Sequence, residues 1–140
     1  MNKLILMTIS CILFLSCGVK LNTGDFIYKE GVTFKAERII DAKGKQVANV
    51  NYFAPKGTRF IQLHLIFENK TDTEQIVDPE DIFLLDDWNN KYSMSFNMKK
   101  RKLKAGESRR VAINFEPAFP EGSNVRVLIV DKIYDLSYRL

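Results

Sequence analysis

Apolar and polar residues alternate along much of this chain, and the alternation is clearest between residues 59 and 68. One side of that segment carries only large apolar residues, Ile61, Leu63, Leu65 and Phe67. The other side is mixed, with Phe60, Gln62, His64 and Ile66. Because a period of two places alternate side chains on opposite faces of a β-strand, this segment is predicted to be a central strand with one fully buried face.

Shorter alternations predict further strands at residues 32–40, 47–52, 111–115, 125–129 and 133–138. Residues 82–85 and 92–96 flank an Asp- and Asn-rich turn at residues 86–90, a pattern typical of a β-hairpin. No stretch of ten or more residues after residue 17 keeps a helical period. The chain is therefore predicted to be all-β, with an immunoglobulin-like antiparallel β-sandwich of about seven to eight strands.

Three connections in this sandwich have their own signals. Asp78 is expected to cap one helical turn that begins at Pro79. Residues 97–107 are expected to form a basic connection. Residues 116–122, which include two prolines and a glycine, are expected to end a strand.

The first 16 residues have the layout of a secretory signal. Lys3 supplies a positive charge, an apolar run of about 12 residues ends at Leu15, and Ser16 precedes Cys17. The run is shorter than the roughly 20 residues that a membrane-spanning helix needs. Residues 1–16 are therefore predicted to be a cleaved lipoprotein signal peptide.

The end of this signal resembles the lipobox of bacterial lipoproteins. Its sequence is Leu15-Ser16-Cys17-Gly18, with Phe14 where that motif usually has Leu, as in the looser lipoboxes of Bacteroidetes-type bacteria. The resemblance implies that Cys17 carries diacylglycerol and becomes the amino terminus, anchored in a membrane by two or more acyl chains. The alternatives are plain secretion after cleavage elsewhere, or an uncleaved N-terminal helix with a buried or free cysteine. We expect the outer membrane or cell surface of the bacterial envelope rather than the inner membrane.

Cleavage would leave a lipidated N-terminus and tether at residues 17–31, either without regular structure or with a first edge strand near Tyr28, and one domain at residues 32–140. Cys11 would be removed with the signal, so that no cysteine pair remains to form a disulfide. The whole chain has a net charge of +4, and loss of Lys3 leaves 20 basic against 17 acidic residues, or +3. Such a mild balance does not favour a nucleic-acid-binding protein.

The order of several short motifs resembles the DUF4352 family of bacterial exported proteins. These motifs are Pro55-Lys56-Gly57-Thr58-Arg59-Phe60, Glu68-Asn69-Lys70-Thr71, Pro79-Glu80-Asp81-Ile82-Phe83-Leu84-Leu85-Asp86, Leu103-Lys104-Ala105-Gly106-Glu107-Ser108 and Val111-Ala112-Ile113-Asn114-Phe115-Glu116-Pro117. The likeness covers roughly residues 33–130 and implies an immunoglobulin-like fold and export. The typical Asp-x-x-Gly turn of that family is altered here at residues 86–90. The resemblance implies no catalytic residues.

Few residues suggest chemistry. His64 is the only histidine, and its strand neighbours offer neither a nucleophile nor a carboxylate, so a structural role is expected. The carboxylates of Asp78, Glu80, Asp81, Asp86 and Asp87 are of the kind that calcium prefers, but their spacing does not match a calcium loop and favours turn capping. Neither a metal nor another cofactor is expected. Trp88, at the predicted hairpin tip, is either a contact residue or packs back onto the sandwich with Tyr92 nearby.

Seven cations lie close together in the sequence. They are Lys99, Lys100, Arg101, Lys102, Lys104, Arg109 and Arg110. They form either a solvated loop that discourages edge pairing or a contact site for an envelope protein or an anionic glycan or lipid. The sequence thus favours a lipid-anchored envelope module that binds or scaffolds a partner without catalysis. A periplasmic immunity or inhibitor lipoprotein and a small hydrolase with an unrecognised site are the alternatives.

Overall fold

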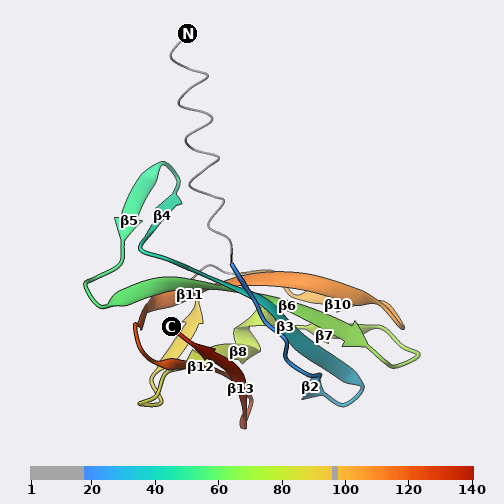
Figure 1. Cartoon of the computed structure of the whole chain (residues 1–140). Helices are drawn as coiled ribbons and strands as arrows, with labels where there is room; N and C mark the ends of the chain where they lie inside the picture. The colour runs from blue at the N-terminus through green and yellow to red at the C-terminus, as the bar shows by residue number, and fades with distance from the viewer. Residues whose placement is uncertain (1–17, 96–97) are drawn as a thin grey trace.

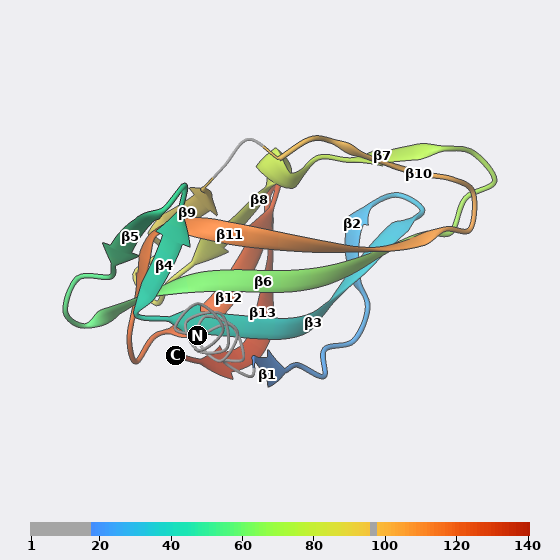
Figure 2. The ribbon, with the colours of Figure 1, turned by 90° about the horizontal axis from the view of Figure 1, so that it is seen from above.

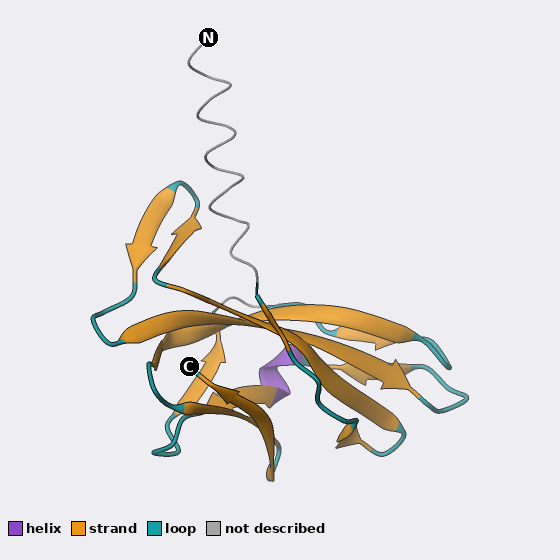
Figure 3. Cartoon of the chain, viewed as in Figure 1, coloured by secondary structure: helices purple, strands orange, loops and turns teal. Residues whose placement is uncertain are grey.

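The structure is a computed structural model that describes residues 18–95 and 98–140 (Figure 1). Within these residues the regular elements are all strands, apart from one 3-10 turn, η1 (Figure 3). The elements are β1 (Val19–Lys20), β2 (Phe26–Lys29), β3 (Val32–Ala42), β4 (Gly44–Val47), β5 (Val50–Phe53), β6 (Thr58–Asn69), β7 (Gln75–Val77), η1 (Pro79–Asp81), β8 (Ile82–Leu85), β9 (Lys91–Met94), β10 (Arg101–Leu103), β11 (Ser108–Pro120), β12 (Asn124–Ile129) and β13 (Lys132–Arg139).

One curled antiparallel sheet makes both layers of the fold. Eight of its nine strands run in the order β1-β3-β6-β11-β9-β8-β12-β13. The ninth, β2, pairs with β3. Because β9 pairs with β11 on one side and β8 on the other, the sheet passes from one layer to the other through β9. In Figure 1, β3, β6 and β11 form the upper layer, and β8, β12 and β13 the lower one. The predicted fold class, an all-β antiparallel sandwich, is confirmed.

The core lies between the two layers and follows the period-two pattern. The four apolar residues of one β6 face, Ile61, Leu63, Leu65 and Phe67, are each 2% exposed or less. The lower layer supplies Val125, Val127 and Ile129 from β12, which are equally buried. The predicted central strand and the predicted hairpin of β8 and β9 are confirmed. So is the cap of η1, where the Asp78 side chain accepts a hydrogen bond from the Glu80 amide at 3.0 Å.

The sheet has more strands than predicted, partly because it begins before residue 32. A first edge strand near Tyr28 is present as β2, but the remainder of the described range is not a free tether, since β1 also pairs with β3. Leu21 and Tyr28 are buried in the core, and the Phe26 ring stacks on Tyr134 with centroids 4.6 Å apart. These apolar residues are too widely spaced to show a period, so only the packed structure reveals their role.

Strand β11 continues through a segment that was expected to end it. Phe115 pairs with Ile61 and Phe119 with Arg59, so the register shifts between them while the strand stays paired to β6. Pro117 lies in this irregular stretch, where a missing amide proton disrupts no ladder hydrogen bond. Phe119 then returns to the core at 1% exposure. The strand was predicted to end within residues 116–122, starting at Glu116. It instead continues through Glu116 and Pro117 and ends at Pro120.

Residues 44–53 form a separate hairpin rather than one extended piece. Val47 pairs with Val50, and the two residues between them, Ala48 and Asn49, have φ angles of 48° and 64°. Two positive φ angles in a two-residue loop are those of a type I′ turn. The β4–β5 hairpin rises above the upper layer in Figure 1.

The predicted basic connection at residues 97–107 also contains a strand. β10 pairs antiparallel with β7, as Figure 2 shows at the end of the molecule away from the hairpin. Leu103 explains this pairing, because its side chain is fully buried and fixes β10 against the sandwich.

Candidate functional site

The structure places the predicted basic residues along β10, just before it, and at the start of β11, which pairs with the last residues of β6. β10 carries Arg101 and Lys102, and a tight turn leads to Arg109 at the start of β11. Arg109 donates a hydrogen bond to the Lys102 carbonyl at 3.3 Å, which joins the two segments. All seven side chains except half-buried Arg101 are exposed. We call the residues Lys99, Arg101, Lys102, Lys104 and Arg109 the basic edge.

The other two predicted cations already have partners. Arg110 forms an ion pair with Glu37 at 2.6 Å, and this ion pair holds the pKa of Glu37 below its ordinary value. Lys100 lies 3.5 Å from the Asp78 carboxylate. Within the described residues, no carboxylate oxygen lies within 4.0 Å of a charged side-chain nitrogen of the basic edge. The Glu107 carboxylate is nearby but accepts a hydrogen bond from the Lys104 backbone amide at 2.7 Å, so the five cationic groups are left for an outside partner.

A shallow pocket of about 460 Å³ lies beside Lys100. Its lining includes Tyr28, Asp78, Asp81, Lys100 and Val130. The Tyr28 hydroxyl donates to Asp81 at 2.7 Å and accepts from the Asp78 amide at 3.0 Å, while burial raises the pKa of Tyr28. These hydrogen bonds pair the polar groups of the pocket with one another.

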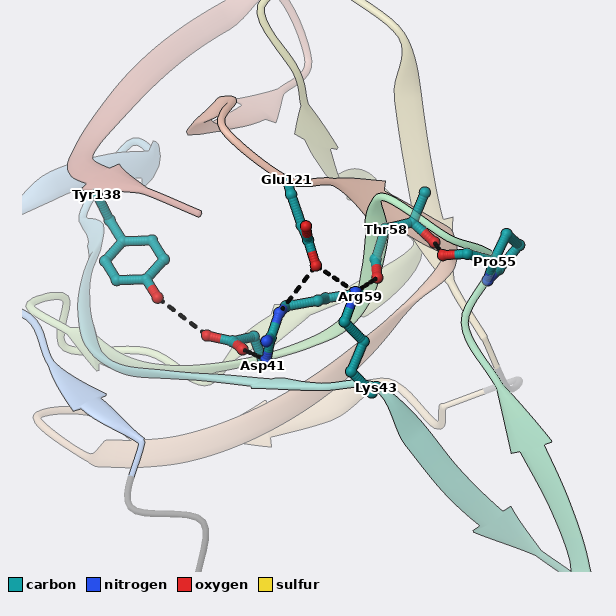
Figure 4. Close-up of polar contacts among 7 residues, drawn as sticks. All are labelled: Asp41, Lys43, Pro55, Thr58, Arg59, Glu121 and Tyr138. Carbon is teal, nitrogen blue, oxygen red and sulfur yellow. Dashed lines mark hydrogen bonds and ion pairs between the residues drawn. The ribbon is translucent and has the colours of Figure 1, made fainter.

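The base of the β4–β5 hairpin holds a charged cluster that the sequence did not reveal (Figure 4). Arg59 bridges two carboxylates, Asp41 at 2.6 Å and Glu121 at 3.3 Å. Tyr138 donates to Asp41 at 3.0 Å, and Lys43 pairs with Glu121. The hydrogen bond from Lys43 lowers the pKa of Glu121, and the hydrogen bond to Asp41 raises the pKa of Arg59. These residues come from β3, β6, β13 and two connections that meet only in the fold, so no spacing signal could have found them.

The acidic turn at residues 86–90 is ordered by its own carboxylate. Asp86 is 1% exposed and accepts four hydrogen bonds, two from Asn90 and one each from the Trp88 amide and the Tyr92 hydroxyl. Burial opposes ionisation, but these hydrogen bonds outweigh it and lower the pKa of Asp86. The turn-capping role expected of this residue agrees with these contacts. Trp88 is 68% exposed, whereas Tyr92 is buried.

His64 and the remaining carboxylates form no cluster. The His64 Nε2 lies 2.9 Å from Gln62 Oε1, and burial, followed by the charge of Arg38, lowers the pKa of His64. In the part of the chain that the structure describes, no group of three or more His, Cys, Asp or Glu side chains is arranged to hold a metal ion. No helix in residues 18–95 or 98–140 is long and apolar enough to cross a membrane. Cys17, the predicted lipidation site, lies outside the described residues.

Comparison with known proteins gives the fold and no activity. No family model matches the chain, and no curated protein matches it. A conserved hypothetical protein from Bacillus anthracis is similar in structure, with a TM-score of 0.59 and 13% identity over 84% of this chain and 95% of that one. An uncharacterized β-sandwich protein from Clostridium difficile 630 aligns with a TM-score of 0.48 and 14% identity over 79% of this chain and 87% of that one. At 13% identity, the similarity to the Bacillus anthracis protein shows a shared fold alone.

Proposed function

We propose that this protein is a non-catalytic binding module of the bacterial cell envelope, anchored by lipid at Cys17, that holds an anionic glycan at its basic edge. The observation that carries the proposal is the set of five neighbouring cations without a carboxylate partner among the described residues. The resemblance to DUF4352 exported proteins and the lipobox-like sequence before Cys17 support the envelope location.

The composition of the basic edge favours a polyanion over a folded protein as the partner. Three of its five residues are lysines, which are depleted in protein interfaces, where aromatic and arginine anchors carry most of the binding energy. Lysine is a mobile point charge that suits repeated carboxylates or phosphates without fixed geometry. The exposed aromatic side chains lie elsewhere, on β5 and at Trp88.

Binding of the detergent-solubilised lipoprotein to immobilised polygalacturonate tests this proposal. Lys102→Glu/Lys104→Glu should abolish retention, because it reverses two charges at the centre of the basic edge. Lys56→Glu/Lys91→Glu makes the same change in net charge at exposed positions elsewhere and should retain binding. Retention of wild type should fall steeply with salt. Equal loss of retention in both double variants would show an effect of net charge alone and contradict a site at the basic edge. Retention of the wild type on an immobilised acidic protein but not on the glycan would contradict the proposed partner.

The anchor has a separate test. Cys17→Ala should abolish incorporation of a fatty-acid analogue and release the protein from membranes, since the thioether acceptor is lost. Ser16→Ala keeps a small residue before the cysteine and should label normally. Equal labelling of Cys17→Ala and wild type would show that Cys17 is not the acceptor.

A further inference from the structure

The β4–β5 hairpin carries a cluster of exposed apolar side chains. Phe53 is 79% exposed, Val50 50% and Tyr52 47%. Nine large apolar side chains are exposed in the described residues, and three of these are on β5. The hairpin rises above the upper layer (Figure 1), and these three side chains are exposed among the described residues. Clustered exposed apolar residues on a monomer mark a contact surface.

The cations around the hairpin are mostly paired. Lys43 and Arg59 belong to the charged cluster at its base, and Lys56 is the one cation of residues 42–59 with no carboxylate within 4.0 Å among the described residues. Lys45 forms an ion pair with Glu116 and lies over the Phe60 ring, 4.5 Å from its centroid, which fixes the lower part of the hairpin to β6 and β11. The free surface of the hairpin is therefore apolar and aromatic with little net charge, a composition that favours the interface of a bilayer.

The N-terminal end of β1 lies close to the base of the hairpin. Val19 pairs with Ile39 and Lys20 with Arg38 in antiparallel register. The residues before Val19 therefore lie toward Ala42, the end of β3 that leads into the hairpin. Gly18 lies close to the side chains of Arg38 and Ile40, near the end of β3 that leads into the hairpin. A lipid on the residue before Gly18 therefore brings this end of β3, and not the basic edge, to the membrane. The basic edge lies far from this end of the layer. The distance along β6 from Phe60, near the hairpin, to Phe67, which pairs with Arg109, is about 24 Å at roughly 3.4 Å per residue.

We infer that the β4–β5 hairpin is a second membrane contact, with Tyr52 and Phe53 seated in the lipid headgroup region beside the acyl anchor. This inference rests on the proposed lipidation of Cys17. Two contacts at one end fix the orientation of the domain, which a single acylated residue cannot do, and turn the lower layer away from the bilayer. The occupant is a lipid surface.

The single tryptophan of the chain provides a control on the far side. Trp88 lies in the β8–β9 loop, which projects below the lower layer while the hairpin rises above the upper one (Figure 1). The full acylated chain is reconstituted into vesicles of phosphatidylethanolamine and phosphatidylglycerol with brominated acyl chains. Wild type reports from Trp88, and the variant Phe53→Trp/Trp88→Phe reports from the hairpin. Flotation of the vesicles first establishes that the protein is anchored.

We expect the indole introduced at position 53 to shift to the blue and to be quenched by bromine, and Trp88 fluorescence to be unchanged. Floating protein with an unquenched indole at position 53 would overturn the hairpin contact and leave the anchor intact. A blue shift without quenching would assign the hairpin to a second copy or a protein partner and also overturn it. Failure to float would overturn both the anchor and the inference that rests on it.

Discussion

At the residue scale, single side chains with several hydrogen bonds hold the loops of this sandwich in place. Asp86 orders the β8–β9 turn through four donors, and Asn69 accepts from Thr71 while its amide donates to the Leu103 and Lys104 carbonyls near 3.1 Å. Both residues are buried. Buried polar groups with complete partners fix one conformation, and the loss of any one partner leaves another group unsatisfied.

Asp86→Asn should destabilise the protein by roughly 2 to 3 kcal/mol at neutral pH. The substitution removes hydrogen bonds to a charged acceptor, and it places the NH₂ group of asparagine against groups that are themselves hydrogen-bond donors. The folded pKa of Asp86 is lowered, so its contribution is present above the unfolded pKa near about 3.9 and is lost as pH falls through the folded pKa. Urea melts between neutral and acidic pH should therefore show a steeper loss for wild type than for the variant. Asp131→Asn, in an exposed turn, should change neither the stability at neutral pH nor its loss at acidic pH.

Adjacent residues of β6 should differ sharply in their effect on stability. Leu65→Ala removes a fully buried side chain and should cost on the order of 2 to 5 kcal/mol. His64→Ala, on the half-buried outer face, should cost roughly 1 kcal/mol or less, since its one side-chain partner is Gln62 on the same strand. Denaturant melts of both variants measure the difference. A larger loss for His64→Ala would mean that the outer face of β6 is covered in the native protein.

At the element scale, strands with a strict period were predictable and those fixed by long-range contacts were not. β6 and β12 follow their apolar alternation, whereas β2 depends on the stacking of Phe26 on Tyr134, far away in sequence. The type I′ turn at Ala48-Asn49 lacks the Asn-Gly pair that usually announces it. For the candidate sites, the basic edge was visible as a charge run, but the pairing of Arg110 and Lys100 was not, because Glu37 and Asp78 come from other elements.

The β12–β13 turn should gain stability from a single substitution. Val130 has a φ of 58° and is 80% exposed, and a β-branched side chain is strained in this region. Val130→Asn should stabilise the fold by about 1 kcal/mol, because asparagine tolerates this conformation and little buried surface is lost. Thermal melts of the variant test this, with Ile133→Asn as the control at an exposed position of ordinary φ. No gain in Val130→Asn would mean that Val130 makes a stabilising contact at the pocket rim.

At the scale of the whole molecule, the two layers depend on contributions from both ends of the chain. The Tyr134 hydroxyl on β13 donates to the Ile27 carbonyl at 2.8 Å, and Tyr138 reaches Asp41 on β3. These contacts join the lower layer to the upper one on the side away from β9, where the sheet itself provides no pairing. β1 and β2 therefore help to close the sandwich and also lie between the proposed anchor and the domain.

Removal of residues 18–31 should consequently weaken the whole fold. A chain that begins at Val32 loses the buried side chains of Leu21 and Tyr28, each of which contributes about 1.5 to 3 kcal/mol. A sandwich of this size typically has only about 5 to 15 kcal/mol of stability, so the shortened chain should unfold at much lower urea concentration. A chain that begins at Gly18 keeps both strands and is the matched control. Equal urea midpoints for the two chains would show that residues 18–31 act as a tether in solution and that their pairing with β3 contributes nothing to folding.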